Sequence, residues 1–401
     1  MGCHEALFFY SPENVYAVFM EMKTAQKKRL LVFHQALAPY RVDLWNSLNE
    51  LYDLKLYFIY ENLLEQKFDQ DDLRSKLNFK CYYLKKGFRI RYRSFRWGFL
   101  SIIRKFKPDV IFTYEYSQTT MFIHFIKKLF NYKFSIYSIC DDSLLLAKNC
   151  KGPRKMSRNY LVEKLDGLIT VNKEVADWYN REFSMKNKCV VFPIIANESV
   201  FRARLNATLS KANLLLTNYK LAGKKCILYV GRLAEFKGID RLIKSFAGIT
   251  RDNPDALLIL VGSGPEFETL KKLTVELGVQ DMVLFAGRHE GLDLLAWYNI
   301  GQVFVLASHQ ENFGAVVNEA LLSGMNVLCS RNAGAHELVT PGINGNTFDP
   351  YDLDTLSALL KDELQKVNNL EQIAAMRPSK MQYSYGECIE NFSEKLNSCV
   401  L

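Results

Sequence analysis

The stretches Leu257-Leu-Ile-Leu-Val261 and Val303-Phe-Val-Leu306 are apolar at every position. A strand with one exposed face alternates apolar and polar residues, whereas a strand buried on both faces is apolar throughout. Longer amphipathic stretches alternate with these and with other short apolar runs along the whole chain. The alternation predicts repeated βα units and therefore an α/β fold of doubly wound parallel sheets.

The length of 401 residues suits two such domains. The polar and irregular segment 197–220 predicts a linker with one edge helix between them. We expect a dispensable N-terminal extension at 1–28, a first domain at 29–197 and a second domain at 198–375. The stretch 376–401 is expected to form a C-terminal helix that can return to the first domain.

The composition excludes several classes of protein. Hydrophobic residues make up 49% and charged residues 24% of the chain, which is typical of a globular protein. The nine cysteines are scattered and form no CxxC pair, which argues against a zinc ribbon and favours a reducing compartment. No apolar run approaches the roughly 20 residues that span a bilayer. We therefore expect a cytoplasmic protein.

The net charge of +9 is concentrated in one segment. Residues 74–108 contain twelve Lys or Arg and no acidic residue, and cations alternate with aromatic side chains between Lys85 and Trp97. Such mixtures occur in surfaces that bind nucleic acid and in surfaces that contact membranes, and also as plain solvated edges. The residues that we predict to contact an anionic membrane are Arg89, Arg91, Arg93, Arg96 and Trp97.

A strand-to-helix turn in the second half combines glycines with cations. Val230 ends an apolar run and is followed by Gly231-Arg232, and then by Lys237-Gly238 directly before an amphipathic helix. Ligands of doubly wound sheets bind beyond the carboxyl ends of the strands. Glycines let backbone approach a ligand closely, and cations neutralise a diphosphate. The turn therefore predicts a diphosphate site, although two solvated surface cations are an equally simple reading.

A second turn carries two carboxylates. After Leu306 comes Ser308-His-Gln-Glu311-Asn312-Phe313-Gly314-Ala315, and Glu319 follows one turn into the predicted helix. Carboxylates at this place can accept hydrogen bonds from sugar or ribose hydroxyls. A single acid here would simply complement the helix dipole, but the pair around Phe313-Gly314 favours a ligand site.

These motifs resemble the retaining GT-B glycosyltransferases of family 4, also called glycosyl transferases group 1. The resemblance rests on four motifs and covers about residues 222–370. They are Gly231-Arg232 with Lys237-Gly238, Gly262-Ser-Gly264-Pro265, Ser308-x-x-Glu311-x-Phe313-Gly314-x4-Glu319-Ala320, and Gly334-x-x-Glu337 with Gly342-x-x-Gly345.

The resemblance implies a GT-B fold, with two Rossmann-like doubly wound domains facing across a cleft. It implies that Arg232 and Lys237 bind the diphosphate of a nucleotide sugar, that Glu311 holds the sugar hydroxyls and that Glu319 holds the ribose. Arg232, Lys237 and Glu311 are the implied catalytic residues. The implied donor-binding set also contains Gly231, Gly262, Arg288, Asn312, Phe313, Gly314 and Ala315.

The first domain is implied to hold the acceptor, a glycan or a lipid-linked saccharide. His34, Tyr40, Asp141 and Asp142 are the candidates there, because they follow predicted strands or lie in the short match Ala38-Pro39-Tyr40-Arg41. We predict no cofactor, no metal and no nucleic-acid partner. The expected donor is a UDP- or GDP-sugar, and the expected location is the cytosolic face of a membrane, to which the protein binds peripherally.

The resemblance implies that such an enzyme serves cell-surface polysaccharide or lipopolysaccharide synthesis. Two alternatives remain open at the level of the sequence. A GT-B-like sugar-nucleotide epimerase would use the same donor site without an acceptor. A non-catalytic protein that binds nucleotide sugars is less compatible with the presence of all four charged residues, Arg232, Lys237, Glu311 and Glu319.

Overall fold

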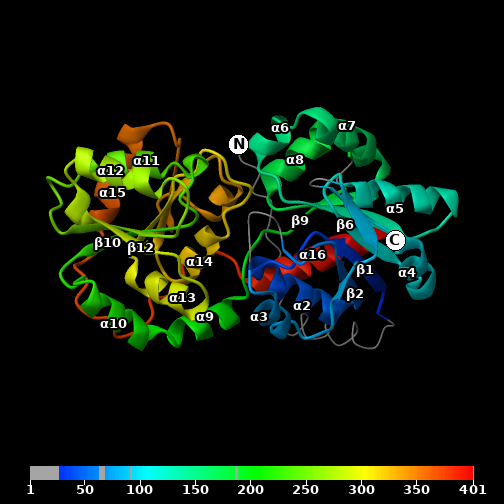
Figure 1. The fold of residues 1–401 in the computed structure, drawn as a ribbon, viewed down its shortest axis with the longest axis horizontal. Helices are drawn as coiled ribbons and strands as arrows, with labels where there is room; N and C mark the ends of the chain where they lie inside the picture. The colour runs from blue at the N-terminus through cyan, green and yellow to red at the C-terminus, as the bar shows by residue number, and fades with distance from the viewer. Residues whose placement is uncertain (1–26, 63–67, 91–92, 186–187, 401) are drawn as a thin grey trace, which may run out of the picture. The chain divides into compact units, whose positions relative to one another are not determined.

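A computed structural model describes residues 27–62, 68–90, 93–185 and 188–400. The chain forms two compact units, one from the residues up to Thr113 with Phe122–Ile136, and one from Tyr114–Met121 with the chain from Tyr137 onward. Two large sheets with helices packed around them confirm the predicted α/β fold (Figure 1). Residues 1–26, most of the predicted extension, lie outside the described residues.

The first sheet has the strand order β3-β2-β1-β6-β7-β8-β9. Strand β1 pairs in parallel with β2 and β6, and β8 pairs in parallel with β7 and β9. The strands are β1 (Arg29–His34), β2 (Asp53–Phe58), β3 (Tyr82–Tyr83), β6 (Val110–Tyr114), β7 (Ser135–Cys140), β8 (Gly167–Thr170) and β9 (Cys189–Val191). The helices between them are η1 (Pro39–Arg41), α2 (Val42–Leu51), α3 (Gln70–Ser75), α4 (Phe99–Phe106), α5 (Gln118–Leu129), α6 (Leu144–Lys148), α7 (Gly152–Leu161), η2 (Val162–Lys164) and α8 (Lys173–Glu182).

The second sheet is parallel, with the order β12-β11-β10-β13-β14-β15. Its direction of winding reverses between β10 and β13, which is where doubly wound sheets bind ligands. Its strands are β10 (Lys225–Val230), β11 (Ala256–Val261), β12 (Val283–Gly287), β13 (Val303–Leu306), β14 (Asn326–Ser330) and β15 (Gly345–Phe348). The remaining helices are α9 (Glu198–Asn206), α10 (Leu209–Asn218), η3 (Glu235–Lys237), α11 (Ile239–Ala247), α12 (Phe267–Glu276), η4 (Gln280–Met282), α13 (Gly291–Ile300), α14 (Val316–Leu322), η5 (Gly334–Leu338), α15 (Leu353–Gln365) and α16 (Tyr385–Val400).

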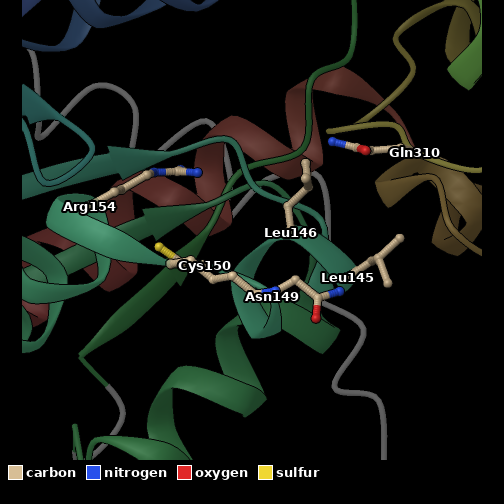
Figure 2. A pocket seen from close by; sticks show the side chains of 7 residues that line it. Leu145, Leu146, Asn149, Cys150, Arg154 and Gln310 are labelled. Carbon is tan, nitrogen blue, oxygen red and sulfur yellow. The ribbon is translucent and has the colours of Figure 1, made fainter.

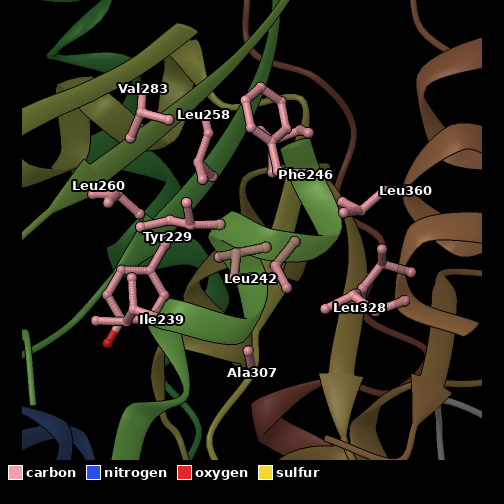
Figure 3. Close-up of a cluster of buried hydrophobic side chains, with 14 of the residues drawn as sticks. Tyr229, Ile239, Leu242, Phe246, Leu258, Leu260, Val283, Ala307, Leu328 and Leu360 are labelled. Carbon is pink, nitrogen blue, oxygen red and sulfur yellow. The ribbon is translucent and has the colours of Figure 1, made fainter. Parts of the chain in front are cut away.

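The apolar runs of the sequence are the centre of the second sheet. Every residue of β11 and β13 is buried, as expected for strands covered on both faces. Helices α11, α12 and α15 cover one face, and α13 and α14 cover the other (Figure 1). Leu242 and Phe246 of α11, Leu360 of α15, Leu258 and Leu260 of β11 and Leu328 of β14 belong to one buried cluster, in which Leu360 lies near Leu328 (Figure 3). This core holds the carboxyl ends of β10, β11 and β13 in place.

The segment 197–220 is not a linker with a single edge helix, so that interpretation was wrong. It forms α9 and α10, and both pack against α13. Asn197 begins α9, since its side chain accepts a hydrogen bond from the backbone N–H of Val200. Only a few apolar side chains of each helix are buried, so the apolar periodicity in the sequence is weak.

Helix α16 packs on the first sheet. Phe192, just beyond β9, contacts the rings of Tyr385 and Phe392 at centroid distances of 6.0 and 5.3 Å. Phe192 and Phe392 are almost completely buried. The end of the described chain is therefore part of the packing around β9.

The basic segment folds into an antiparallel hairpin of β4 (Gly87–Ile90) and β5 (Arg93–Arg96). Arg91 lies outside the described residues, as do the side chains of Arg89 and Arg93. Arg96 donates a hydrogen bond from Nη1 to the carbonyl of Lys85 at 3.1 Å. Trp97 is 48% exposed. Within the described part of the chain, no helix combines the length and the apolar character that a membrane span requires.

Candidate functional site

The turns that follow three neighbouring strands of the second sheet are bonded to one another. The backbone N–H of Gly231, after β10, donates to the carbonyl of Val261 at 3.0 Å. The N–H of Gly262, after β11, donates to the carbonyl of Gly287 at 2.8 Å. The N–H of Leu233 donates to the carbonyl of Ser263 at 3.0 Å. The glycine turns predicted from the sequence therefore form one continuous layer at the carboxyl ends of β10, β11 and β12.

Gly262 occupies a place that no other residue fits. Its φ is +153°, and a Cβ atom added there would lie 1.8 Å from the carbonyl oxygen of Gly231. The oxygen belongs to the backbone and the position of a Cβ is fixed by the backbone, so no side-chain rotation relieves the overlap. Glycine is required here because two turns of the backbone pass each other directly.

Lys237 and Glu311 meet although they are far apart in the sequence. Lys237 ends η3 after β10, and Glu311 follows β13. The Nζ of Lys237 forms an ion pair with Oε2 of Glu311, and the two side chains are only 16% and 15% exposed. The Oγ of Ser308 lies 3.3 Å from the same carboxylate oxygen and can donate a hydrogen bond to it. The predicted diphosphate site and sugar site thus share one pair of charged side chains.

Backbone contacts hold this pair together. The N–H of His309 donates to the carbonyl of Phe236 at 3.1 Å, which joins the turn after β13 to η3. Gly238 has a φ of +64°, and a Cβ there would lie 2.4 Å from the carbonyl oxygen of Ala307. The start of α11 therefore approaches the end of β13 more closely than a residue with a side chain would allow.

The other predicted donor-binding residues lie in different environments. Arg232 is exposed, and its carbonyl accepts a hydrogen bond from the hydroxyl of Tyr229 at 3.0 Å. Arg288 follows β12, and its Nε donates to Oε1 of Glu290 at 3.0 Å. Phe313 is buried, whereas Asn312 is exposed. Gly314 and Ala315 precede α14, and Gly314 has a φ of +95°.

Glu319 has a partner that the sequence did not indicate. The hydroxyl of Tyr298, on α13, donates a hydrogen bond to Oε2 of Glu319 at 2.6 Å. Burial raises the pKa of the Glu319 carboxyl above its ordinary value, and the hydrogen bond from Tyr298 counteracts the rise. Tyr298 lies in an apolar stretch that reads as core, so only the three-dimensional structure brings it to Glu319.

Two of the acceptor-side candidates lie in the first unit. His34 ends β1, and its Nδ1 lies 3.3 Å from the carbonyl oxygen of Ala36. Its ring and that of Trp45 form an edge-to-face pair at a centroid distance of 5.3 Å. Tyr40 is in η1 and is 36% exposed. His34 is thus partly packed into the unit, while Tyr40 presents its ring to the surface.

The other two candidates, Asp141 and Asp142, belong to a charged cluster. Its other members, Arg154 and Glu115, were not predicted from the sequence. Asp141 is half-buried, whereas Asp142 is buried. The Nη2 of Arg154 donates to both carboxylate oxygens of Asp142, at 2.7 and 2.8 Å. The same nitrogen lies 3.4 Å from Glu115. Glu115 directly follows the strand Val110–Tyr114. Its place after a predicted strand was the feature of the sequence that could have marked it as a candidate.

The carboxyl group of Glu115 has a raised pKa. Burial raises the pKa of its carboxyl to about 7, Arg154 lowers it, and the negative charges of Asp142 and Asp141 raise it. Its side chain is 30% exposed, so it is accessible to solvent. The cluster therefore contains a carboxyl group that is partly protonated at neutral pH, next to a fixed arginine.

Arg154 also lines a pocket of about 290 Å³. Leu145, Leu146, Asn149 and Cys150 contribute to one side of it, and Gln310, from the segment after β13, contributes to the other (Figure 2). Lys151 completes the lining. Gln310 directly precedes Glu311 in the sequence. The pocket therefore adjoins the segment that carries the Lys237–Glu311 pair, and its walls contain amides and cations but no acidic residue.

Among the described residues, one group of side chains has the types and spacing of a metal site: Glu174, His336 and Glu337. The carboxylate of Glu337 accepts hydrogen bonds from the backbone N–H groups of Lys173 and Glu174 at 2.9 and 2.7 Å. These bonds satisfy two N–H groups at the start of α8. The absence of a functional metal stays a prediction.

Comparison with known proteins identifies the second half of the chain. Residues 218–376 match the family described as glycosyl transferases group 1. A GDP-mannose-dependent alpha-(1-6)-phosphatidylinositol monomannoside mannosyltransferase of Mycolicibacterium smegmatis is 31% identical over 153 residues, which is 36% of this chain and 40% of the relative. A poly(glycerol-phosphate) alpha-glucosyltransferase of Bacillus subtilis is 32% identical over 179 residues, or 43% of this chain and 25% of the relative. The chain thus spans less than half the length of these curated relatives.

Over almost the whole chain, the fold is similar to that of the Anabaena protein HepE, solved in complex with UDP and glucose. The TM-score is 0.68 at 16% identity, and the similarity covers 92% of this chain and 100% of that one. Residues 218–376 therefore belong to the glycosyl transferases group 1 family, and the chain has the two-domain GT-B fold that their motifs predict.

Proposed function

We propose that this protein is a retaining glycosyltransferase that moves a hexose from a UDP- or GDP-sugar to a glycan or a lipid-linked saccharide. The observation that carries the proposal is the ion pair between Lys237 and Glu311 at the carboxyl ends of β10 and β13. In a nucleotide sugar, the anomeric carbon is bonded directly to the diphosphate. A site for it therefore needs a cation and a hydroxyl acceptor a few ångströms apart, and this pair supplies both.

The chemistry of each group follows from its charge. The ammonium of Lys237 and the guanidinium of Arg232 balance the negative charge that grows on the departing diphosphate as the bond to the sugar breaks. The carboxylate of Glu311 accepts hydrogen bonds from the sugar hydroxyls and so fixes the ring. The acceptor oxygen bonds to the anomeric carbon on the face from which the diphosphate leaves, and a phosphate oxygen takes its proton. The configuration at that carbon is then retained.

The acceptor is proposed to bind on the side of the first sheet. The pocket lined by Asn149, Arg154 and Gln310 supports this, because it adjoins the segment that carries Glu311 and offers hydrogen-bond donors suited to a saccharide. Asp142 and Glu115 hold the guanidinium of Arg154 in a fixed orientation. His34, Tyr40 and Asp141 remain candidates for further contacts with the acceptor.

The biological setting is proposed from the relatives and the charge pattern together. The name of one relative specifies a phosphatidylinositol-linked mannoside, and that of another specifies a polymer of glycerol phosphate. Glycans of this kind belong to the cell surface, so we place the protein in cell-surface polysaccharide or lipopolysaccharide synthesis. We propose peripheral binding to the cytosolic face of the membrane through the basic segment that includes Arg96 and Trp97.

A thermal-shift screen against UDP-, GDP-, ADP- and CMP-sugars tests the donor assignment. A ligand that binds only the native state raises the melting temperature, and a concentration of 100 Kd stabilises it by about 2.7 kcal/mol. The nucleotide sugar that gives the largest shift is then incubated with saccharide acceptors, and the glycosylated product is detected by mass spectrometry. No shift with any of the sugars would contradict the proposal. Release of the nucleoside diphosphate in the absence of any acceptor would favour the alternative, a sugar-nucleotide epimerase.

The two carboxylates are expected to contribute to different parts of donor binding. Glu319→Gln should weaken the nucleoside diphosphate and the nucleotide sugar equally, because both contain the ribose. Glu311→Gln should weaken only the nucleotide sugar. Each loss is expected to be about tenfold or more, as for a hydrogen bond to a charged group. Calorimetric titration of both ligands measures this, with Glu268→Gln, on the exposed face of α12, as the control. Equal losses for both ligands in both variants would contradict the assignment.

Transfer is expected to continue in excess EDTA. The reason is that Arg232 and Lys237 supply the positive charge that a divalent ion supplies to the diphosphate in other enzymes. Initial rates with and without the chelator, and after addition of magnesium or manganese, measure this. A rate that falls on chelation and recovers with metal would show that a metal ion takes part.

A further inference from the structure

Helix α5 carries apolar side chains on a buried face and on a neighbouring exposed face. Ile123 and Ile126 point into the unit and are 0% and 2% exposed. Phe122, Phe125 and Leu129 are 44%, 56% and 60% exposed. They are spaced by three and four residues, so they share one face of the helix. The two isoleucines are buried by the packing of α5, whereas the other three side chains form an exposed apolar face.

The exposed apolar surface continues beyond the helix. Phe130, directly after α5, is 41% exposed. The ring of Phe122 contacts that of Phe99, the first residue of helix α4, at a centroid distance of 5.7 Å. Trp97 precedes α4 by two residues and contacts Phe88 at 5.8 Å, and these side chains are 48% and 49% exposed. We call Phe122, Phe125, Leu129 and Phe130 the apolar face of α5.

Several cations lie on the elements that carry this face. The guanidinium of Arg104, in α4, lies 5.1 Å from the centre of the Phe130 ring. Lys105, Lys128 and Lys133 are exposed on α4, on α5 and just beyond α5. Neither α4 nor the stretch 116–140 contains an acidic residue. The two helices and the residues just after α5 therefore carry a net positive charge beside the apolar face.

The charge pattern decides between possible occupants of this face. Large apolar patches on a soluble protein mark a surface that binds a partner or a membrane. A second copy of the chain would bring two sets of cations together, and like charges facing each other oppose association. A lipid bilayer with anionic headgroups accepts apolar side chains and attracts the surrounding cations at the same time. Phenylalanine is also among the apolar residues that amphipathic helices insert at the headgroup boundary.

We propose that the apolar face of α5 inserts into the headgroup region of an anionic lipid bilayer. The proposal rests on the membrane partner given under the proposed function and extends it. Binding by the cations of the basic segment is electrostatic, so high salt weakens it. Insertion of apolar side chains adds a contribution that salt does not screen. Loss of salt-resistant binding in a variant of the apolar face, with the basic segment unchanged, is therefore the signature of insertion by α5.

Sedimentation with vesicles tests this on the full chain. Vesicles of phosphatidylcholine with phosphatidylglycerol are compared with phosphatidylcholine alone, at low salt and at about 1 M NaCl, where the Debye length is about 3 Å. The test variant is Phe122→Ser/Phe125→Ser/Leu129→Ser. The matched control is Leu214→Ser/Val275→Ser/Ile343→Ser, which changes side chains that are 63%, 62% and 62% exposed elsewhere. The melting temperature and the shift with nucleotide sugar show that each variant is folded.

We expect the wild type and the control variant to keep binding the anionic vesicles at high salt. In the test variant, the affinity for anionic vesicles at high salt should be at least about tenfold lower than in the wild type. Equal binding by the test variant and the wild type overturns the inference but leaves electrostatic membrane binding in place. No vesicle binding by the wild type overturns both, while the donor assignment stands or fails by its own thermal-shift test. A wild-type dimer in ultracentrifugation that becomes monomeric in the test variant would assign the face to self-association and overturn the inference.

Discussion

Replacement of Arg232 or Lys237 by alanine is expected to slow sugar transfer by a factor on the order of 10²–10³. Each substitution removes a positive charge that balances the departing diphosphate in the transition state. Arg232 is exposed and Lys237 lies at a turn, so neither contributes to the core and the fold should persist. Steady-state kinetics with the identified donor measure the loss in kcat/KM, and the melting temperature checks the fold.

The ion pair of Lys237 requires an additional variant. Lys237→Ala leaves the largely buried carboxylate of Glu311 without its partner, which by itself alters the site. Lys237→Ala/Glu311→Gln removes this unpaired charge, and comparison with the single variants isolates the role of the lysine. Lys244→Ala, which changes an exposed lysine in α11 paired with Asp240, is the control. Near-wild-type turnover in both Arg232→Ala and Lys237→Ala would contradict the proposed mechanism.

Gly262→Ala is expected to destabilise the second unit and to abolish nucleotide-sugar binding. The new Cβ would lie 1.8 Å from the carbonyl oxygen of Gly231, so the turns after β10 and β11 must separate. A backbone conflict of this kind costs on the order of 3 kcal/mol. In a unit of this size, that corresponds to a fall in melting temperature on the order of 10 °C. Differential scanning calorimetry and titration with the nucleotide sugar measure the two effects.

Gly278→Ala separates the two causes of this loss. Gly278 also has a positive φ, +68°, but a Cβ there would have no atom within 4 Å. The control therefore carries backbone strain without the collision, and it lies outside the donor site at the end of α12. It should lower the melting temperature only slightly and leave donor binding unchanged. A Gly262→Ala variant as stable as Gly278→Ala would show that the two turns do not need their close approach.

Some features of the fold were predictable because they depend on local pattern. The apolar runs at 257–261 and 303–306 lie in β11 and β13, and every residue of these two strands is buried. A strand buried on both faces has no polar side chain to obscure the pattern. The parallel sheets follow from this regularity, whereas the GT-B fold was implied by the family resemblance. The family followed from short motifs that lie directly after such strands.

Other elements had no comparable signal. The hairpin of β4 and β5 lies in a stretch where nearly every second residue is a cation, so apolar alternation is weak. The helices α9 and α10 bury only a few side chains each, so the sequence pattern predicted a linker with one edge helix instead of two helices. Helices α6 and α7 were not predicted, although α7 positions Arg154 against Asp142. A prediction from sequence needs a regular local pattern of apolar residues. In these elements that pattern is weak, and contacts with residues far away in the sequence stabilise them instead.

The sequence by itself determined the α/β class, the family of the second half and the residues that carry charge at the ends of its strands. These are local properties, because a βα unit places the residue after each strand at the same edge of the sheet. Only the tertiary structure decided that Lys237 meets Glu311 and that Tyr298 donates to Glu319. It alone shows Glu115, Asp142 and Arg154 as one cluster and the apolar face of α5 as exposed. The reason is that a sequence pattern gives the direction of a side chain within its own element, whereas its partner and its burial depend on how other elements pack against it.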